Sequence, residues 1–278
     1  MKNVLTIYIA LFILILSSCQ NNSAGGTTTG NPLVAFTMTG SSVPTTVALN
    51  KIRFPLLSAL FNQAIALPPP ILKDSTNTPV SLNEAWISVR QVEFKASETA
   101  GVGEVPGSSV SFLDPVAVNL IASNPQFFGQ VRIITSTLRR IRMQLHNVDV
   151  LPANAPAGLI NKSIYWKGSV GVRQFTFSTT EGLDYELAGP NGVALTENSN
   201  ILLSIQVANL FKKMNMTAVT DGMNINKDNR VPVANPCPLI NSSATDIYTC
   251  FIDGLKTESN LGRDDANDGE LIGDATVK

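Results

Sequence analysis

The stretch Ile201-Leu202-Leu203-Ser204-Ile205-Gln206-Val207-Ala208 decides the fold class. Its branched aliphatic side chains recur at every second position, namely Ile201, Leu203, Ile205 and Val207. Side chains two residues apart on a β-strand point to the same face, so this spacing is typical of a strand with one apolar and one mostly polar face. The sequence therefore predicts a strand whose odd-numbered side chains face a hydrophobic core.

The same period of two recurs in both directions from this strand, across residues 80–212. The alternating sets are Val116, Val118 and Leu120; Ile141, Met143 and Leu145; Ile164 and Trp166; Phe175 and Phe177; and Leu183, Tyr185 and Leu187. Several short strands joined by turn-rich links indicate an all-β fold. We expect an antiparallel β-sandwich, with one short N-terminal helix and an irregular C-terminal tail.

The segment Ala85 to Lys95 changes the parity of its apolar side chains. Ile87 and Val89 share one parity, whereas Val92 and Phe94 share the other. A regular strand would turn one of these pairs away from the core, because its side-chain period is two. We predict a β-bulge near Arg90-Gln91 that restores the inward direction. The alternative is a strand whose two halves are buried on different faces.

The chain begins like a secretory signal peptide. Basic Met1-Lys2-Asn3 precedes an apolar run, Val4 to Leu16, that is shorter than the ~20 residues a membrane-spanning helix needs. The next stretch, Leu16-Ser17-Ser18-Cys19, resembles the lipobox of bacterial lipoproteins. This resemblance implies that residues 1–18 are removed and that Cys19 carries lipid chains that anchor the protein to a membrane of the cell envelope.

Residues that follow the predicted lipid anchor suggest the destination and the domain order. Gln20-Asn21 lacks the Asp that retains some lipoproteins at the inner membrane, a pattern that resembles outer-membrane sorting. We expect a flexible tether over 19–50, in which Leu33 to Thr39 has the loose alternation of a short strand. Beyond it we expect a helix and Pro-rich connector over 51–78, the sandwich over 79–215 and a loop-rich, acidic region over 216–278.

The expected helix rests on one apolar pattern. Its residues lie one, three and four apart, as on one face of a helix, and comprise Leu56, Leu57, Leu60, Phe61, Ala64 and Ile65. This helix either packs on the sandwich or lies on the bilayer near the anchor. Its polar face has few Lys or Arg residues, which argues against the bilayer.

The strand region also has a resemblance to a known family. The succession 83–94, 116–120, 138–145 and 163–168 resembles an uncharacterised family of bacterial lipoproteins, whose domain of unknown function is similar to a transthyretin-like β-sandwich. The likeness covers roughly residues 80–215 and rests on pattern more than on particular letters. It implies a transthyretin- or immunoglobulin-like sandwich but no activity and no catalytic residues.

Charge and cysteine content limit the classes of partner. The net charge of −1 and the scattered Lys and Arg residues argue against nucleic acid as a partner. With Cys19 lipidated, Cys237 and Cys250 remain, and a pair of cysteines in an oxidising compartment predicts a disulfide. A zinc site is disfavoured, because His146 is the single histidine that could join them.

Most catalytic signatures are absent from the sequence. It contains neither Gly-x-Ser-x-Gly nor a Gly-Lys-Ser/Thr phosphate loop. A Ser-His-Asp triad would have to use His146, but that residue shares a strand face with Arg140 and Arg142, as expected of a solvated surface. We therefore expect no catalytic site that a motif defines.

Acidic clusters raise the possibility of calcium, which binds carboxylate and amide oxygens. The candidate ligands near the C-terminus are Asp264, Asp265, Asp268 and Glu270. This cluster lacks two ligands of a complete calcium loop, and a solvated terminus is the alternative. A second cluster, Asn224, Asn226 and Asp228, has the spacing but little charge. Calcium is the one cofactor that the sequence suggests.

Aromatic residues suggest a ligand contact. Trp86 and Trp166 are expected to fill the core, since sandwich strands bury large rings. Tyr165 would then point to the opposite face from Trp166 and is the candidate for stacking on a ligand such as a sugar.

Taken together, the patterns predict a tethered cell-envelope lipoprotein whose sandwich serves for binding or structure without catalysis. Its partners would be the membrane, through the lipid, and a protein or glycan of the envelope. The alternatives are an envelope hydrolase whose active site has no motif, built for example on paired carboxylates, and a calcium-stabilised adhesion module.

Overall fold

The computed structural model describes residues 32–41, 72–96, 109–122, 124–133, 137–239, 243–264 and 271. Several predicted features lie outside these residues: the signal peptide, Cys19, the apolar helix pattern at 56–65, and Asp265, Asp268 and Glu270. In the part of the chain that is described, no helix has the length and apolar character needed to cross a membrane. These described residues are mostly β-strand, in two sheets, with few helices.

Sheet A has four strands in the order β12-β10-β1-β5. Their bounds are Ser259–Arg263, Ser199–Gln206, Leu33–Ser41 and Gln126–Arg132. β1 runs parallel to β10, whereas the other two pairs are antiparallel. The expected purely antiparallel arrangement is therefore wrong for this sheet. Parallel neighbours need a long crossover, and here most of the chain lies between the two strands.

Sheet B has eight strands, with the path β11-β8-β7-β3-β6-β9 and two further strands, β2 and β4, that pair with β3. In chain order their bounds are Leu72–Lys73 (β2), Pro79–Lys95 (β3), Ser109–Asn119 (β4), Thr137–Leu145 (β6), Ile164–Val170 (β7), Arg173–Thr179 (β8), Leu183–Ala194 (β9) and Met223–Ile225 (β11). β11 runs parallel to β8, and the other pairs in this sheet are antiparallel. All the strands predicted from alternation are present.

β3 is the strand that the rest of sheet B shares. Its first half pairs with β7 and its second half with β6. The predicted bulge is confirmed, because the register shifts between Val89 and Gln91 and leaves Arg90 as the extra residue. Val92 is consequently buried on the same side as Val89. A second register shift, between Leu82 and Glu84, was not predicted.

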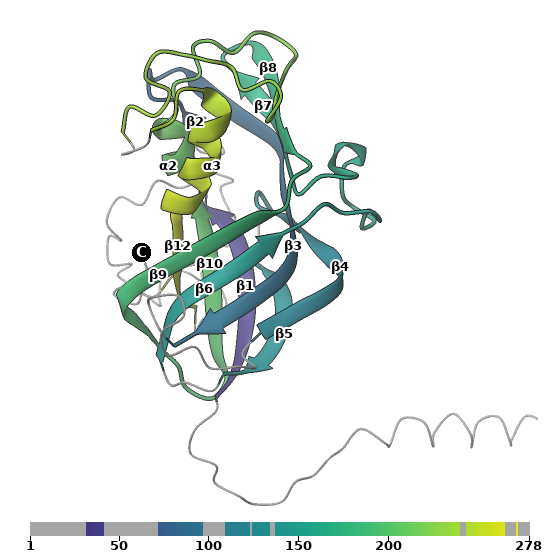
Figure 1. Cartoon of the computed structure of the whole chain (residues 1–278), viewed down its shortest axis with the longest axis vertical. Helices are drawn as coiled ribbons and strands as arrows, with labels where there is room; N and C mark the ends of the chain where they lie inside the picture. The colour runs from purple at the N-terminus through teal and green to yellow at the C-terminus, as the bar shows by residue number, and fades with distance from the viewer. Residues whose placement is uncertain are drawn as a thin grey trace, which may run out of the picture. The chain divides into compact units, whose positions relative to one another are not determined.

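The two sheets share one hydrophobic core. In Figure 1, β9, β6 and β3 cross in front of β12, β10 and β1. Phe36 of β1 lies between Phe94 of β3 and Phe128 of β5, with ring centroids 5.5 and 5.4 Å away. Ile201, one of the aliphatic side chains that the alternation assigned to the core, is fully buried. The packing therefore joins strands that lie far apart in the sequence.

Two helices cover one end of sheet B. These are α2 (Val207–Lys212) and α3 (Ile247–Thr257), which lie near β7 and β8 in Figure 1. The ring of Phe251 on α3 stacks on Phe177 with centroids 4.3 Å apart and meets Trp166 edge-on at 5.0 Å. The predicted disulfide between Cys237 and Cys250 is present and ties the preceding loop to α3.

The sheets extend beyond the limits of 79–215 expected for the sandwich. β1 lies inside the expected tether yet occupies an interior position in sheet A. α3 and β12 lie in the region expected to be irregular, and Leu261 of β12 is buried opposite Leu203. β12 adds to the edge of sheet A by pairing with β10. A strand placed by such pairing needs few apolar residues of its own, so its composition did not predict it.

Candidate functional site

A bulge in β5 places two side chains on the outer face of sheet A. Phe36 pairs with Gly129 and Thr37 pairs with Phe127, so the register passes over Phe128. Residues three apart on a regular strand point to opposite faces. Because of the extra residue, Phe127 and Gln130 instead share the face that points away from the core, while Phe128 is buried.

Gly129 supplies the backbone conformation of this bulge. Its φ of +137° is one that residues with a side chain rarely adopt. A Cβ built on Gly129 would meet nothing within 4 Å, so space does not require the glycine. The requirement is conformational, and it couples the residue at this position to the direction of Phe127.

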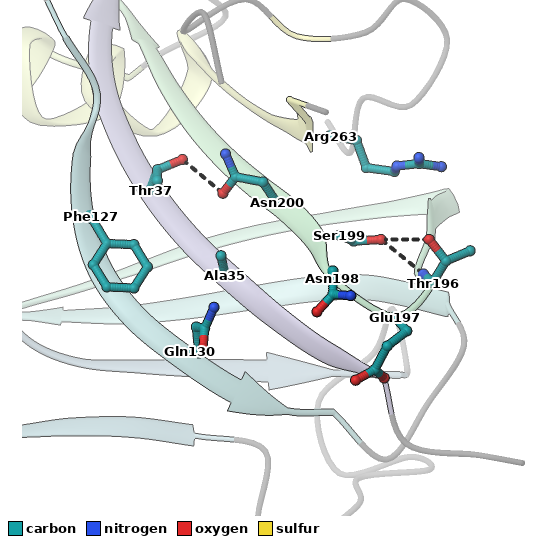
Figure 2. Close-up of a pocket in the computed structure, with 10 residues that line it drawn as sticks. All are labelled: Ala35, Thr37, Phe127, Gln130, Thr196, Glu197, Asn198, Ser199, Asn200 and Arg263. Atoms are coloured by element: carbon teal, nitrogen blue, oxygen red, sulfur yellow. Dashed lines mark hydrogen bonds between the residues drawn. The ribbon is translucent and has the colours of Figure 1, made fainter. Parts of the chain in front are cut away.

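Phe127 and Gln130 line a groove of ≈ 500 Å³ on the outer face of sheet A. Figure 2 shows the groove, which is built by β1, β5, the start of β10 and the turn before it. Its lining residues are Ala35, Thr37, Phe127, Gln130, Thr196, Glu197, Asn198, Ser199, Asn200 and Arg263. We refer to this set as the groove.

The floor of the groove is held by buried polar side chains. Thr37 Oγ1 donates to the Asn200 side-chain oxygen at 3.3 Å or to the carbonyl of Ile201 at 3.2 Å. Asn200 Nδ2 donates to the carbonyl of Asp264 at 3.3 Å, which links the floor to the end of β12. Buried hydrogen bonds of this kind fix side-chain positions, so the floor is preorganised.

One wall of the groove is the turn between β9 and β10. The amide of Thr196 donates to Ser199 Oγ at 2.9 Å, and Asn198 takes a left-handed φ of 62° between them. Glu197 Oε2 accepts from the amide of Leu33 at 3.0 Å and lies 3.8 Å from Arg132 Nη1. The wall is therefore fastened to one end of the β1–β5 pair, where Leu33 and Arg132 are register partners.

The groove combines one exposed aromatic ring with mostly uncharged polar groups. Phe127 is 61% exposed, which is high for a ring of this size. Among the lining residues in the described part of the chain, Glu197 carries the one carboxylate. A glycosidase-type site needs two carboxylates across the bond that breaks, so this arrangement suits binding better than hydrolysis.

The predicted C-terminal calcium cluster is described at one residue. Asp264 is fully buried, and its amide donates to the carbonyl of Asn200 at 3.0 Å. Asp265, Asp268 and Glu270 lie outside the described residues. Within the ranges that are described, no three His, Cys, Asp or Glu side chains group as they would around a metal ion.

The second suggested calcium cluster uses its oxygens within the protein. Asn226 Oδ1 accepts from the amides of Asp228 and Asn229 at 2.9 and 3.0 Å. Asn224 Oδ1 accepts from Ser178 Oγ at 3.1 Å. Lys227 lies within the same loop and pairs with Glu181. These contacts stabilise the loop and place a positive charge in it, so the site does not favour a cation.

Tyr165 lies on the opposite side of β7 from Trp166, as predicted, but its ring is half-buried. It packs with Trp86 in a small outer cluster beneath the 3₁₀ helix η1 (Ala157–Leu159). A Cβ on Gly158 would come within 2.3 Å of the Tyr165 ring, so Gly158 lies against the hydroxyl end of this side chain. Partial burial, together with the charge of Glu84, raises the pKa of Tyr165. Its role in ligand contact stays a prediction.

Trp86 and Trp166 are both buried, at 7% and 0% exposure; Trp166 lies in the main core, as expected, whereas Trp86 lies in the separate outer cluster. The single histidine lies beside a serine, since the amide of His146 donates to the carbonyl of Ser88 at 3.1 Å. Ser88 is fully buried, and its hydroxyl has no hydrogen-bond partner among the described atoms. A nucleophilic serine must reach both a base and a substrate, so this pair lacks the geometry of a triad.

Comparisons of the chain with protein families, curated proteins and solved structures found no match. The groove residues were not singled out from the sequence. Phe127-Phe128 shows no alternation, so β5 itself was missed. The available signal was Gly129, since a glycine inside a strand often marks a bulge.

Proposed function

We propose that this protein is a lipid-anchored, non-catalytic binding protein of the bacterial cell envelope, with the groove on sheet A as its binding site. The observation that carries the proposal is the exposed ring of Phe127 beside hydrogen-bonding side chains on a fixed floor. The lipobox-like Leu16-Ser17-Ser18-Cys19 supports the anchor, and residues 20–21 support the outer membrane. A transthyretin-like sandwich type and kinship with an uncharacterised lipoprotein family belong to the same proposal.

The construction of the groove supports recognition. Its floor and one side lie on paired strands, and sites on strands hold their side chains more rigidly than sites on loops. Its volume lies within the range of about 300–1,000 Å³ that is usual for ligand sites. Rigid placement lowers the entropy lost on binding, which favours affinity.

Two experiments test this proposal. For the anchor, the change is Cys19→Ala, followed by detergent-phase partitioning of whole cells. We expect the wild type in the detergent phase and the variant in the aqueous phase, because the acyl chains supply the membrane affinity. A variant that still partitions fully into detergent would contradict the lipid anchor.

For the groove, the change is Ala35→Trp, because Ala35 lies on its floor and an indole there would fill it. The measurement is binding of the purified full chain to cell-envelope fractions, with Cys19→Ala in every variant so that no acyl chain contributes to binding. We expect at least about tenfold weaker binding than wild type, whereas the matched control Val172→Trp, at a 95% exposed turn position, should bind normally. Equal binding by both variants would remove the groove as the site.

A further inference from the structure

We propose that the groove binds an uncharged saccharide chain, with one pyranose ring stacked on Phe127. This inference rests on the proposed binding function and names its ligand class. It is argued from three features of the groove: the ring, the polar side chains that surround it and the balance of charge.

The ring comes first. Phe127 is 61% exposed on β5, while its neighbour Phe128 is 7% exposed in the core. The bulge at Gly129 directs Phe127 outward beside Gln130, so the exposed ring is built into the strand register. The face of a phenyl ring attracts C–H groups through its quadrupole and its apolar surface. A pyranose ring presents such a C–H face with hydroxyls around its rim.

The polar lining matches the hydroxyls. The groove includes the amides of Gln130 and Asn198 and the hydroxyl of Thr196. An amide offers donors and an acceptor in one plane, and a hydroxyl can do either. A sugar hydroxyl likewise donates and accepts, so these side chains can satisfy it from both directions.

The charges favour a neutral ligand. Of the lining residues that the structure describes, Glu197 and Arg263 are charged and have opposite signs. Glu197 also lies 3.8 Å from Arg132 at the rim. An anionic polymer would meet a carboxylate without an excess of lining cations, and this argues for uncharged sugars.

The position of the groove argues against a peptide strand as the ligand. The groove lies on the face of sheet A, where the backbone groups of β1 and β5 are already paired with each other. A peptide that adds to a sheet binds to backbone groups at an edge. On this face the contacts come from side chains, as recognition of a saccharide requires.

The experiment is calorimetric titration of the purified full chain in a detergent without a sugar headgroup. The probes are oligomers of N-acetylglucosamine, of glucose and of galacturonic acid. We expect saturable binding of at least one neutral oligomer and weaker binding of the acidic one. Phe127→Ala should weaken the neutral ligand about tenfold, Phe127→Tyr should retain it, and the distant Val172→Ala should match the wild type. Thermal unfolding checks that each variant is folded.

Each other outcome overturns the inference. If no neutral oligomer binds while envelope binding remains sensitive to Ala35→Trp, the groove binds another class of ligand, such as a protein, and the proposed function survives. If a neutral oligomer binds equally well to Phe127→Ala, the ring is not the platform. If the galacturonic acid oligomer binds best, the ligand is not neutral.

Discussion

β3 and β5 each contain an extra residue, and the two strands use it in opposite directions. In β3 the extra Arg90 is exposed, and it keeps Val89 and Val92 on the core side. In β5 the extra Phe128 is buried, and its insertion keeps Phe127 and Gln130 on the outer side. One bulge preserves the continuity of the core, and the other assembles a surface.

The difference shows how one backbone device serves two purposes. A bulge changes the face of the sheet on which the following side chains lie. If those side chains are buried, the bulge affects the core; if they are exposed, it affects the surface. The β3 bulge should therefore matter for the free energy of unfolding, and the β5 bulge for the shape of the groove. Deletions and substitutions around each extra residue test whether the two bulges have these different roles.

The largest effect is expected from deleting Ser88, two residues before Arg90. The shortened strand can remain regular, but Val89 then turns outward and Arg90 turns into the core. Losing the burial of Val89 costs about 1.5–3 kcal/mol, and burying an unpaired guanidinium costs several more. The sum is a large share of the ~5–15 kcal/mol that stabilises a domain, so loss of cooperative unfolding in circular dichroism is expected.

Deleting Arg90 is the matched control for this change. It removes the extra residue and leaves Val89 and Val92 on the same face of a regular strand. We expect this variant to unfold cooperatively. If the two deletions were equally damaging, the position of the bulge would not be what keeps the core continuous.

The next largest effect separates two neighbouring phenylalanines. Phe128→Ala should lower the free energy of unfolding by about 3–5 kcal/mol, because its buried ring packs 5.4 Å from Phe36. Phe127→Ala should change it by less than about 0.5 kcal/mol, since the ring is mostly exposed. Urea unfolding of both variants measures the difference. Similar losses would show that Phe127 contributes to the core.

Gly129→Ala should have an intermediate effect. The new side chain would be strained at φ +137°, at a cost of about 1–3 kcal/mol, or the bulge would relax and redirect Phe127. Gly182→Ala is the control, because a Cβ there makes an ordinary contact 3.4 Å from the Leu145 carbonyl. Gly129→Ala should lower the free energy of unfolding measured in urea and should weaken envelope binding, whereas Gly182→Ala should change neither. Wild-type behaviour would mean that the bulge does not need this glycine.

The smallest expected effect is on the pH dependence of the free energy of unfolding, through a tyrosine buried in the core. Tyr185 of β9 is buried and donates to the carbonyl of Leu255 at 2.8 Å, and burial raises its pKa. The pKa of Tyr185 in the folded protein exceeds its unfolded value of about 10. The stabilisation that the protonated Tyr185 gives the folded state is therefore complete below about pH 10 and is lost as the pH rises above it.

The measurement is the free energy of unfolding of wild type and Tyr185→Phe between pH 8 and about pH 11. The variant should lose about 0.5–1.5 kcal/mol near pH 8, and the difference should shrink as pH rises above about 10. A difference that stays constant across this range would contradict the raised pKa.

The sequence predicted what depends on local repetition. Alternation identified β10 and most of sheet B, and the parity change between Val89 and Val92 located the bulge in β3. The disulfide between Cys237 and Cys250 was predicted because two cysteines remain after Cys19 in a chain expected to enter an oxidising compartment. The strands and the bulge are visible as a periodic pattern of apolar residues, and the disulfide is visible from the number of cysteines.

What was missed depends on partners distant in sequence. The short strand expected at Leu33 to Thr39 is present as β1, but it was assigned to the tether because its place in sheet A comes from β10 and β5. The start of α3 is marked by Asp246, whose side chain accepts from the Thr249 amide at 2.7 Å, but an Asn- and Asp-rich surrounding hid that signal. The groove combines residues from four separate segments, so no motif could reveal it.

The pairing of β1 with β10 also affects the order in which the molecule can form. Thr37 and its partner carbonyl at Ile201 are 164 residues apart in the chain. A chain that emerges N-terminus first must hold β1 without this neighbour until nearly three quarters of it has appeared. Such non-local pairing is slow and leaves a strand edge open to other chains. A chain truncated at residue 198 should therefore show no cooperative unfolding, and rapid folding of that fragment would contradict this view.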